Sequence, residues 1–188
     1  MHLSRKIIIP VGLPASGKTS LRDEYIREHP GTCVVSPDDI RMRMLDYENT
    51  GACFDESIEK NVWNEALAIF DGCMKNGKDI YFDATNMNRW SRDKIIRRVD
   101  RSRYKIIAYY IDIDPYLAIV RNEKRKRKVP SRRILEMASV LEMPSKKEGI
   151  DTIIIIEEIP SDTEKIEIKA VRERYSIYNE KNASRRMV

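Results

Sequence analysis

Residues 12–19 read Gly12-Leu13-Pro14-Ala15-Ser16-Gly17-Lys18-Thr19, which matches the pattern G-x-x-x-x-G-K-[ST] of a phosphate-binding loop. Residues 6–11 before it are predicted to be a strand, because residues 7–11 are apolar without alternation, as in a strand buried in a parallel sheet. A helix is expected after it, at residues 20–29, where Pro30-Gly31 ends the pattern. The alternative is a glycine-rich turn that merely joins strand to helix, but a chance match in a chain of this length is expected about one time in a hundred. The stretch therefore predicts nucleotide binding.

The residue types in this loop each have a chemical reason. Glycine lets backbone N–H groups approach a polyphosphate, and the following helix adds N-terminal donors and a positive dipole end. Lys18 would place its ammonium against the outer phosphates, and Thr19 would offer its hydroxyl to Mg²⁺. We predict that the protein binds ATP or another nucleoside triphosphate with Mg²⁺. The loop residues expected to contact the nucleotide are Gly12, Pro14, Ala15, Ser16, Gly17, Lys18, Thr19 and Ser20.

Strand and helix patterns alternate outward from the loop. Apolar runs predict strands at 32–36, 79–83, 105–113 and 150–156, and helical periodicity predicts helices at 56–76, 89–100, from 115 to the basic stretch, and at 131–141. This alternation predicts an α/β fold with a central parallel sheet of about five strands and helices on both faces. Residues 161–188 are charged and weakly patterned, so we expect a domain at 1–160 and an extension with an edge strand at 165–170 and a frayed tail at 182–188.

Composition narrows the class of protein. The 188 residues fit one domain of ordinary size, and the net charge of +5 favours an anionic partner without naming it. No run approaches the roughly 20 apolar residues of a membrane span, and nothing suggests export, so we expect a cytoplasmic protein with no membrane partner. Three cysteines without a CxxC pair argue against a disulfide framework or a zinc site and predict reduced thiols. The oligomeric state is not indicated.

The segment after the second predicted strand, residues 36–41, is the first candidate for a phosphate-acceptor site. In a parallel sheet the carboxyl ends of the strands share one edge, so this segment can face the phosphate loop. Asp38 there could accept the proton of an attacking hydroxyl. Arg41, one helical turn later, could hold an anionic group with two hydrogen bonds. The alternative is that Asp38 or Asp39 merely caps a helix.

The segment after the third predicted strand is the second candidate. Asp83 could orient Mg²⁺ or its waters, hold Arg41 or bind substrate, and Thr85 and Asn86 follow it on the same edge. A plain turn is the alternative. Trp63 is expected in the core, and Trp90 is a weaker candidate for stacking on a base. Asp112-Ile113-Asp114 is not a phosphatase site, because Pro115-Tyr116 follows instead of Gly/Val-Thr.

Residues 121–128, RNEKRKRK, carry six basic residues in eight. Their place between a helix and Pro130 predicts a lid at about 121–130 that closes over the nucleotide. An arginine from it would neutralise charge on the transferring phosphoryl group, and the other cations would attract a phosphodiester backbone. A solvated charged segment or a localisation signal is the alternative.

Taken together, these residues resemble the kinase domain of phage-type 5′-polynucleotide kinases. The matching elements are GLPASGKT, HPGTCVVSPDDIR, FDATNMN and RNEKRKRKVPSRRI, in order from about residue 6 to 141. The resemblance implies a P-loop kinase fold and transfer of the γ-phosphate of ATP to the 5′-hydroxyl end of DNA or RNA. It also implies a role in nucleic acid repair, in the host cytoplasm if the protein is phage-encoded.

The resemblance also implies roles for single residues. Asp38 would be the general base and Arg41 would contact the acceptor's phosphate, with Asp83 matching the acidic residue after the third strand. Lys18 and Thr19 would serve the ATP phosphates and Mg²⁺. Arg125 would be the lid arginine on the donor phosphates, with Arg121 a weaker candidate for this role. Residues 46–54, which should shape the acceptor entrance, do not match the family pattern.

Two other functions stay open. A small-molecule or nucleoside/nucleotide kinase would use the same loop and lid with a closed acceptor pocket. A nucleotide-dependent binding module would bind or hydrolyse the nucleotide without transferring its phosphate.

Overall fold

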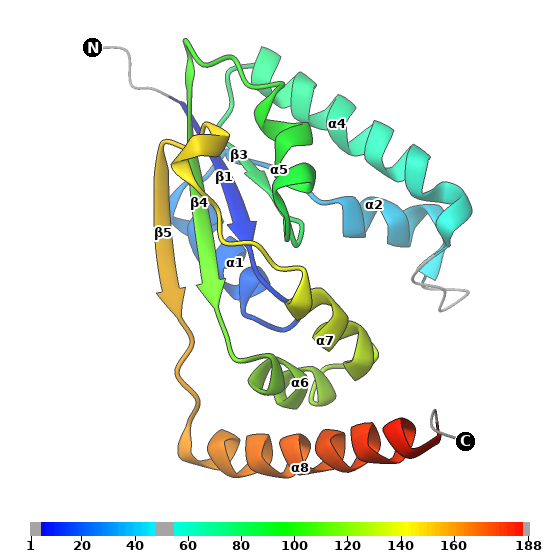
Figure 1. Ribbon diagram of the computed structural model, residues 1–188. Coiled ribbons are helices and arrows are strands. Elements are labelled where there is room, and N and C mark those ends of the chain that lie inside the picture. Colours follow the sequence, from blue (N-terminus) through cyan, green and yellow to red (C-terminus); the bar gives the residue numbers. More distant parts are fainter. Residues whose placement is uncertain (1–4, 48–54, 186–188) are drawn as a thin grey trace.

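A five-stranded parallel sheet with strand order β2-β3-β1-β4-β5 forms the centre of the protein (Figure 1). The structure, a computed structural model, describes residues 5–47 and 55–185. The strands are β1 (Arg5–Val11), β2 (Cys33–Val35), β3 (Ile80–Phe82), β4 (Tyr104–Asp112) and β5 (Thr152–Glu157). The predicted α/β class and five-stranded parallel sheet are confirmed.

Helices cover both faces of this sheet and its carboxyl edge. They are α1 (Lys18–Glu28), α2 (Pro37–Met44), α4 (Glu59–Lys75), α5 (Arg89–Ile96), α6 (Pro115–Glu123), α7 (Ser131–Ser139) and α8 (Asp162–Arg185), with 3₁₀ turns η1 (Glu56–Ile58) and η2 (Lys146–Glu148). Helices α4 and α5 pack on one face and α1 on the other. A second apolar cluster joins α6, α7 and α8 beyond the carboxyl edge (Figure 1).

The central strand β1 is buried on both faces, which explains its unbroken apolar run. Ile7 and Ile9 point into the cluster with α4 and α5, whereas Ile8 points toward Tyr25 of α1. Each of these isoleucines is completely buried, and burying a side chain of this size stabilises the fold by about 1.5–3 kcal/mol. The strand that carries the phosphate loop is therefore held from both sides.

The predicted edge strand at residues 165–170 is wrong, because the whole segment is part of helix α8. Ile168 and Val171, one helical turn apart, are buried against the apolar cluster of α6 and α7. Asp162 and Glu164 lie in the first turn, where the positive end of the helix dipole favours carboxylates. The predicted frayed tail at 182–188 is helical up to Arg185, and residues 186–188 lie outside the described part.

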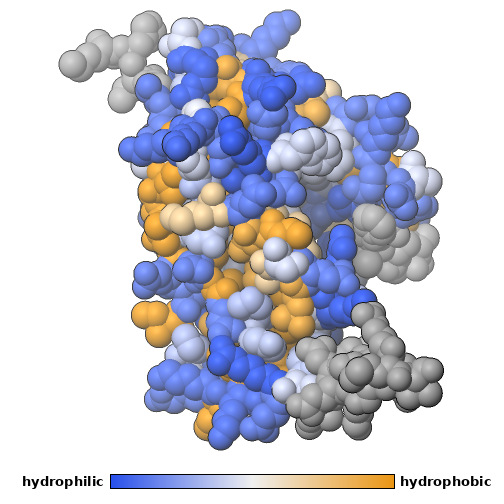
Figure 2. Space-filling view, in the orientation of Figure 1, coloured by the Kyte–Doolittle hydropathy of each residue, from blue (hydrophilic) through white to orange (hydrophobic). Residues whose placement is uncertain are grey.

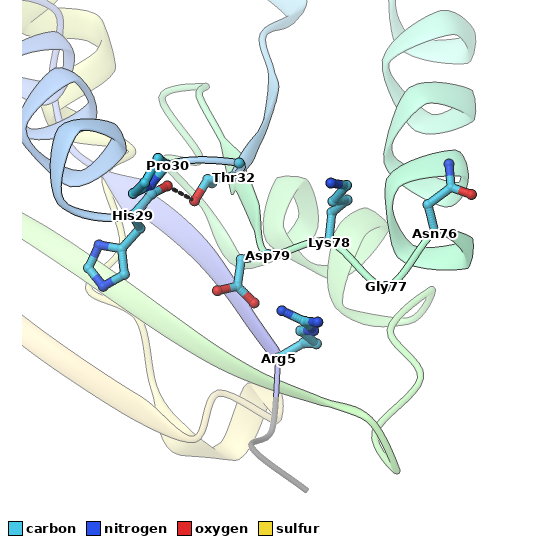
Figure 3. A pocket seen from close by; sticks show the side chains of 9 residues that line it. Arg5, His29, Pro30, Thr32, Asn76, Gly77, Lys78 and Asp79 are labelled. Atoms are coloured by element: carbon cyan, nitrogen blue, oxygen red, sulfur yellow. Dashed lines mark hydrogen bonds between the residues drawn. The ribbon is translucent and has the colours of Figure 1, made fainter.

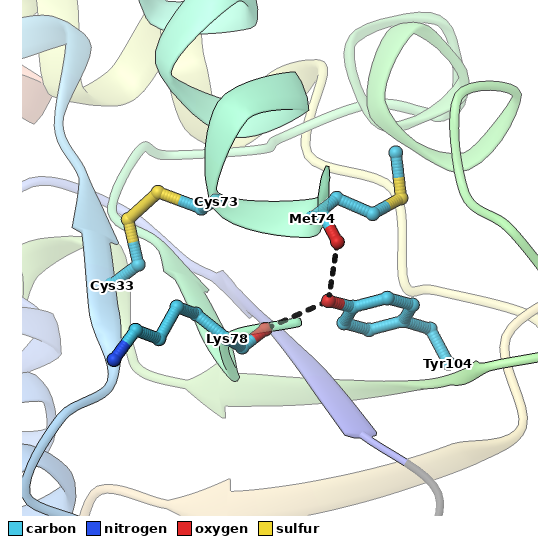
Figure 4. Close-up of a disulfide and its surroundings, with 5 residues drawn as sticks. All are labelled: Cys33, Cys73, Met74, Lys78 and Tyr104. Atoms are coloured by element: carbon cyan, nitrogen blue, oxygen red, sulfur yellow. Dashed lines mark hydrogen bonds between the residues drawn. A yellow bond between two sulfur atoms is a disulfide. The ribbon is translucent and has the colours of Figure 1, made fainter. Parts of the chain in front are cut away.

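The prediction of reduced thiols is wrong for two of the three cysteines. Cys33 at the start of β2 and Cys73 in the last turn of α4 form a disulfide (Figure 4). Their Cα atoms are 6.2 Å apart, within the range that a disulfide spans. The Tyr104 hydroxyl lies within hydrogen-bond distance of the carbonyls of Met74 and Lys78 beside it. The end of α4 is thus tied to the sheet, and a sequence separation of 40 residues hid the pairing.

Strand β5 leaves apolar side chains at the surface. Ile154 and Ile155 are 37% and 50% exposed, and Figure 2 shows hydrophobic side chains along the edge of the molecule where Figure 1 places β5. Most of the remaining surface in that view is hydrophilic. Within the described ranges, no helix has the length and apolar content to cross a bilayer.

Candidate active site

Three of the predicted segments leave the sheet side by side at its carboxyl edge. Strands β2 and β3 end in register, with Val35 paired to Phe82, and the Asp83 amide donates to the carbonyl of Val35 at 2.8 Å. The Gly12 amide, at the start of the phosphate loop, donates to the carbonyl of Thr85 at 3.2 Å. The loop after β1 is therefore bonded directly to the segment after β3.

The phosphate loop has a backbone that a polyphosphate can approach. Gly17 adopts φ +99° and Ala15 φ +61°, so the chain turns sharply in the left-handed region before α1. A Cβ on Gly12 would lie 2.9 Å from the Ser16 hydroxyl, closer than real side chains allow. Helix α1 has no side-chain cap and no acidic residue in its first turn, so its N-terminal N–H groups can receive an anion.

Lys18 is folded back onto the loop that carries it. Its ammonium donates to the carbonyl of Gly12 at 2.9 Å and to that of Leu13. Burial lowers the pKa of Lys18 to about 8, while the charges of Asp83 and Asp38 raise it and the charge of Arg125 lowers it. Asp38, Asp83 and Arg125, three of the predicted site residues, are therefore close enough to Lys18 to act on its charge.

These residues fit the donor that the sequence predicted. The loop amides, the free helix N-terminus and the Lys18 ammonium suit the phosphates of a nucleoside triphosphate. Thr19 is exposed in the first turn of α1, where its hydroxyl could bind Mg²⁺. Such an ion would supply Lewis-acid stabilisation of the phosphoryl oxygens.

Helix α2 brings Asp38 and Arg41 onto one face. Its cap is Ser36, whose hydroxyl accepts from the Asp39 amide at 3.2 Å, so neither aspartate is the capping residue. Asp38 lies in the first turn and pairs with Arg41 one turn later. The side chain of Asp38 is 61% exposed, so a bound molecule can reach it.

Arg41 is held by Glu59, a residue that the sequence did not single out. Glu59, the first residue of α4, accepts from both Nε and Nη2 of Arg41, the latter at 3.0 Å. The hydrogen bond to Glu59 is the main cause that raises the pKa of Arg41 above its ordinary value. Since Glu59 lies 18 residues from Arg41, no short-range pattern could have shown the pair.

Asp83 does not hold Arg41, which was one of its three predicted roles. It instead accepts from Arg22 of α1 at 2.8 Å, and Arg22 had no place in the sequence prediction. Burial raises the pKa of Asp83, while Arg22 and Lys18 lower it and Asp39 raises it further. Asp83 thus lies between the phosphate loop and the first turn of α2.

The prediction that Asn86 contacts the substrate disagrees with its surroundings. Asn86 is 2% exposed, and its amide nitrogen donates to three backbone carbonyls, including that of Pro10 at 2.8 Å. It adopts φ +47°, which asparagine tolerates better than most residues. Asn86 therefore ties the segment after β3 to the end of β1. Thr85 contributes its backbone carbonyl to Gly12, and its side chain is half-buried.

The two ends of the basic lid are held together by the side chain of Asn122. The Asn122 side-chain nitrogen donates to the Val129 carbonyl at 2.8 Å, and its side-chain oxygen accepts from the Val129 amide at 2.9 Å. Arg127 reaches from the lid to α2, with Nη2 3.9 Å from Oδ2 of Asp38 and Nη1 3.1 Å from the sulfur of Met42. The lid therefore approaches the aspartate proposed as the base.

The three lid arginines have different surroundings. Arg121 is engaged by Glu158 at 2.6 Å and Glu164 at 2.9 Å, and its hydrogen bond holds the pKa of Glu164 down to about 2. Arg127 faces α2. Arg125 is exposed and forms no ion pair with any described residue. Arg125 is thus the lid arginine that can turn toward a bound nucleotide without breaking an existing pair.

A separate hollow lies at the opposite, amino edge of the sheet (Figure 3). It measures about 370 Å³ and is lined by Arg5, His29, Lys78, Asp79 and the turns beside them. The Thr32 hydroxyl donates to the carbonyl of His29 at its rim. None of the residues predicted from the motifs lines this hollow, so the candidate site is the carboxyl edge.

Comparisons with known proteins assign the chain to a family. Residues 7–144 match the AAA_33 family, an AAA domain. A protein of Autographa californica nuclear polyhedrosis virus, provisionally named a bifunctional polynucleotide kinase/RNA ligase, is 24% identical in an alignment 136 residues long that covers 68% of this chain. The match spans 19% of that relative's own length.

Solved structures share the fold at low sequence identity. A chain of the Pnkp1/Rnl/Hen1 RNA repair complex superposes with a TM-score of 0.64 at 21% identity, covering 75% of this chain and 45% of that one. A gluconokinase from Sinorhizobium meliloti gives a TM-score of 0.54 at 16% identity, covering 95% and 98% of the two chains.

The resemblance to polynucleotide kinases and the predicted P-loop kinase fold are confirmed. P-loop kinases typically use ATP with Mg²⁺. The chain belongs to the AAA_33 family of AAA domains and has the fold of P-loop kinases.

Proposed function

We propose that this kinase transfers the γ-phosphate of ATP to the 5′-hydroxyl end of a polynucleotide, DNA or RNA. The kinase domain comprises residues 1–160 with its lid at 121–130, and residues 161–188 are an extension whose helix packs on α6. Lys18, Asp38, Arg41 and Arg125 are the proposed catalytic residues. This activity would suit a role in nucleic acid repair.

The proposed reaction is an in-line displacement at the γ-phosphorus. The 5′-oxygen of the acceptor forms a bond to phosphorus as the bond to the leaving oxygen of ADP breaks, and the hydroxyl proton passes to a carboxylate oxygen of Asp38. Arg41 would bind the phosphate that follows the acceptor nucleoside, because its planar fork suits phosphate oxygens. Lys18 and Arg125 would neutralise the charge on the transferring group, and Asp83 and Thr85 would line the site between donor and acceptor.

One observation carries the proposal: Asp38, the Arg41 fork and a cationic lid meet beside the phosphate loop. Asp38 acts electrostatically on Lys18, pairs with Arg41 and has the lid's Arg127 3.9 Å away. A base next to an anion-binding arginine suits an acceptor that carries both a hydroxyl and a phosphate. Lys126 and Lys128 in the lid form no ion pair with a described residue, so they are available to a phosphodiester backbone.

The direct test is label transfer. The protein is incubated with γ-labelled ATP, Mg²⁺ and 5′-hydroxyl oligonucleotides of DNA and RNA in parallel, with 5′-phosphorylated oligonucleotides of the same sequence as controls. We expect label on the 5′-hydroxyl strands alone. Absence of label from both DNA and RNA would overturn the proposal.

The second candidate is a small-molecule kinase. The observation in its favour is the gluconokinase structure, which matches this chain over nearly its full length, whereas the RNA repair protein is covered by less than half. Gluconate and a nucleoside are therefore included as acceptors in the same assay. Transfer to either one, without transfer to oligonucleotides, would favour this candidate. ATP hydrolysis without transfer to any acceptor would favour a nucleotide-dependent binding module.

Salt dependence separates the two kinases quantitatively. The affinity of a single-stranded polynucleotide falls with salt with a logarithmic slope of about −0.7 per phosphate contacted. We expect the KM for the oligonucleotide to rise steeply between low and moderate salt. The KM for ATP serves as the internal reference, since ATP has no phosphodiester backbone that could contact the lysines of the lid. A flat oligonucleotide KM would argue against a polynucleotide acceptor.

A further inference from the structure

The guanidinium of Arg41 is oriented before any acceptor arrives. Arginine has five N–H donors in one plane, and three of them are used here: Nε and Nη2 donate to the two oxygens of Glu59, and Nη1 donates to Asp38. Two N–H groups remain, one on each terminal nitrogen. A paired carboxylate fixes the plane of the fork as well as its position.

A second arginine–glutamate pair joins the same two helices and serves as a comparison. Arg43 of α2 pairs with Glu65 of α4, but the Arg43 side chain is 65% exposed and that of Glu65 is 32% exposed. In the first pair the Arg41 side chain is 11% exposed and that of Glu59 is 23% exposed. An exposed pair is screened by water and contributes little to stability, so it does not fix a side chain as the enclosed pair does.

Without Glu59, Asp38 would be the main carboxylate partner of Arg41. Arg127 already faces Asp38 at 3.9 Å, so without Glu59 the proposed base would be the main carboxylate for two arginines. Glu59 accepts two of the three hydrogen bonds that Arg41 donates, and it does so from helix α4. The Asp38 side chain remains 61% exposed on the other side.

We propose that Glu59 is a positioning residue that sets the plane of Arg41 so that its two unused donors receive the phosphate of the acceptor. This rests on the proposed polynucleotide kinase function and adds a determinant of acceptor affinity outside the motifs. Glu59 itself touches neither nucleotide nor acceptor in this scheme. Its effect must therefore pass through Arg41 and must be absent when Arg41 is absent.

The test is a double-mutant cycle on acceptor KM. We expect Glu59→Gln to raise the KM for a 5′-hydroxyl oligonucleotide and for a nucleoside 3′-monophosphate by about 10- to 100-fold, the usual scale for a misplaced binding group. The KM for ATP should stay within about twofold of the starting protein. In an Arg41→Ala background, Glu59→Gln should change the acceptor KM by less than about twofold, because the residue it positions is gone. Glu59→Asp, which keeps the carboxylate, should recover part of the loss.

Glu65→Gln is the matched control, since Glu65 lies on the same helix and pairs with the same neighbouring helix. It should leave acceptor KM and kcat within about twofold. Thermal melting of each variant checks that α2 and α4 still pack. A Glu59→Gln protein with unchanged acceptor KM, or one whose defect is the same size with and without Arg41, would overturn the inference while leaving the kinase proposal intact. Failure of the starting protein to label any oligonucleotide would overturn both.

Discussion

The two halves of the candidate site are built in different ways. The proposed donor half is one contiguous stretch, residues 12–19, whose backbone amides would face the nucleotide together with the start of α1. The acceptor half is assembled from Asp38 and Arg41 on α2, Glu59 on α4 and Arg127 on the lid. The donor half relies on backbone geometry held by a buried strand, whereas the acceptor half relies on ion pairs between side chains that are partly exposed.

This difference has a practical consequence for mutagenesis. Backbone donors cannot be deleted one at a time by substitution. Binding in the donor half can therefore be altered mainly by substituting Lys18 or the loop glycines. Each member of the acceptor half can be changed by a single substitution without disturbing the sheet. The variants below separate the halves by whether kcat, the affinity for ATP or the stability responds.

Arg125→Ala should have the largest effect, because Arg125 would join the two halves when the lid closes. We expect kcat for transfer to fall by about 10³-fold or more, as for other arginines that neutralise a transferring phosphoryl group. Arg121→Ala is the control, since Arg121 is already engaged by Glu158 and Glu164, and it should lose less than about tenfold. Equal losses in the two variants, measured by single-turnover kinetics, would contradict the assignment.

Asp38→Asn should come next and should affect the acceptor half alone. Removing the proton acceptor should lower kcat by about 10²- to 10⁴-fold. Binding of a non-hydrolysable ATP analogue, measured by calorimetry, should change by less than about threefold. Asp39→Asn, on the adjacent residue, is the matched control and should retain most of the activity. Full activity in Asp38→Asn would show that another group accepts the proton.

Raising the pH should lower the affinity for ATP, which depends on the donor half, by a smaller factor than the losses of kcat above. In the free protein the pKa of Lys18 is lowered to about 8 by burial, so its ammonium loses its proton above that pH. Since the phosphates need the charged form, the affinity for an ATP analogue should fall about tenfold per pH unit above pH 8. Lys18→Met, which has no charge to lose, should bind weakly with no such dependence. An affinity of the starting protein that is flat between pH 7.5 and 9.5 would contradict the role of Lys18.

Reduction of the Cys33–Cys73 disulfide should change activity least, although the bond joins β2, the strand before α2, to α4. The bond closes a loop of 40 residues, and breaking it should lower the free energy of unfolding by about 2–4 kcal/mol. The melting temperature should therefore fall by roughly 4–16 °C in dithiothreitol, while kcat at 25 °C stays within about twofold. The Cys33→Ala/Cys73→Ala double variant should melt at one temperature with and without dithiothreitol. A large loss of kcat on reduction would mean that the bond positions α2 or α4.

Several features of the fold and site follow from local patterns. The apolar runs gave the five strands, and the phosphate loop with its flanking strand and helix gave the donor half, because each depends on residues close in sequence. The position of Asp38 and Arg41 one turn apart on α2 is likewise a local property. The edge strand expected at 165–170 was wrong because Ile168 and Val171 find a partner surface on α6, and such a surface exists only after the chain has folded.

The sequence by itself determined the sheet, the phosphate loop, the basic stretch at residues 121–128 and the family, since each depends on short stretches with their own chemistry. Tertiary structure alone decided that Glu59 holds Arg41, that Arg22 pairs with Asp83, that Arg121 is engaged by Glu158 and Glu164, and that Cys33 meets Cys73. These partners are 18 to 61 residues apart along the chain. The physical reason is that an ion pair or a disulfide needs two groups within a few ångströms, and packing of helices on the sheet sets those distances.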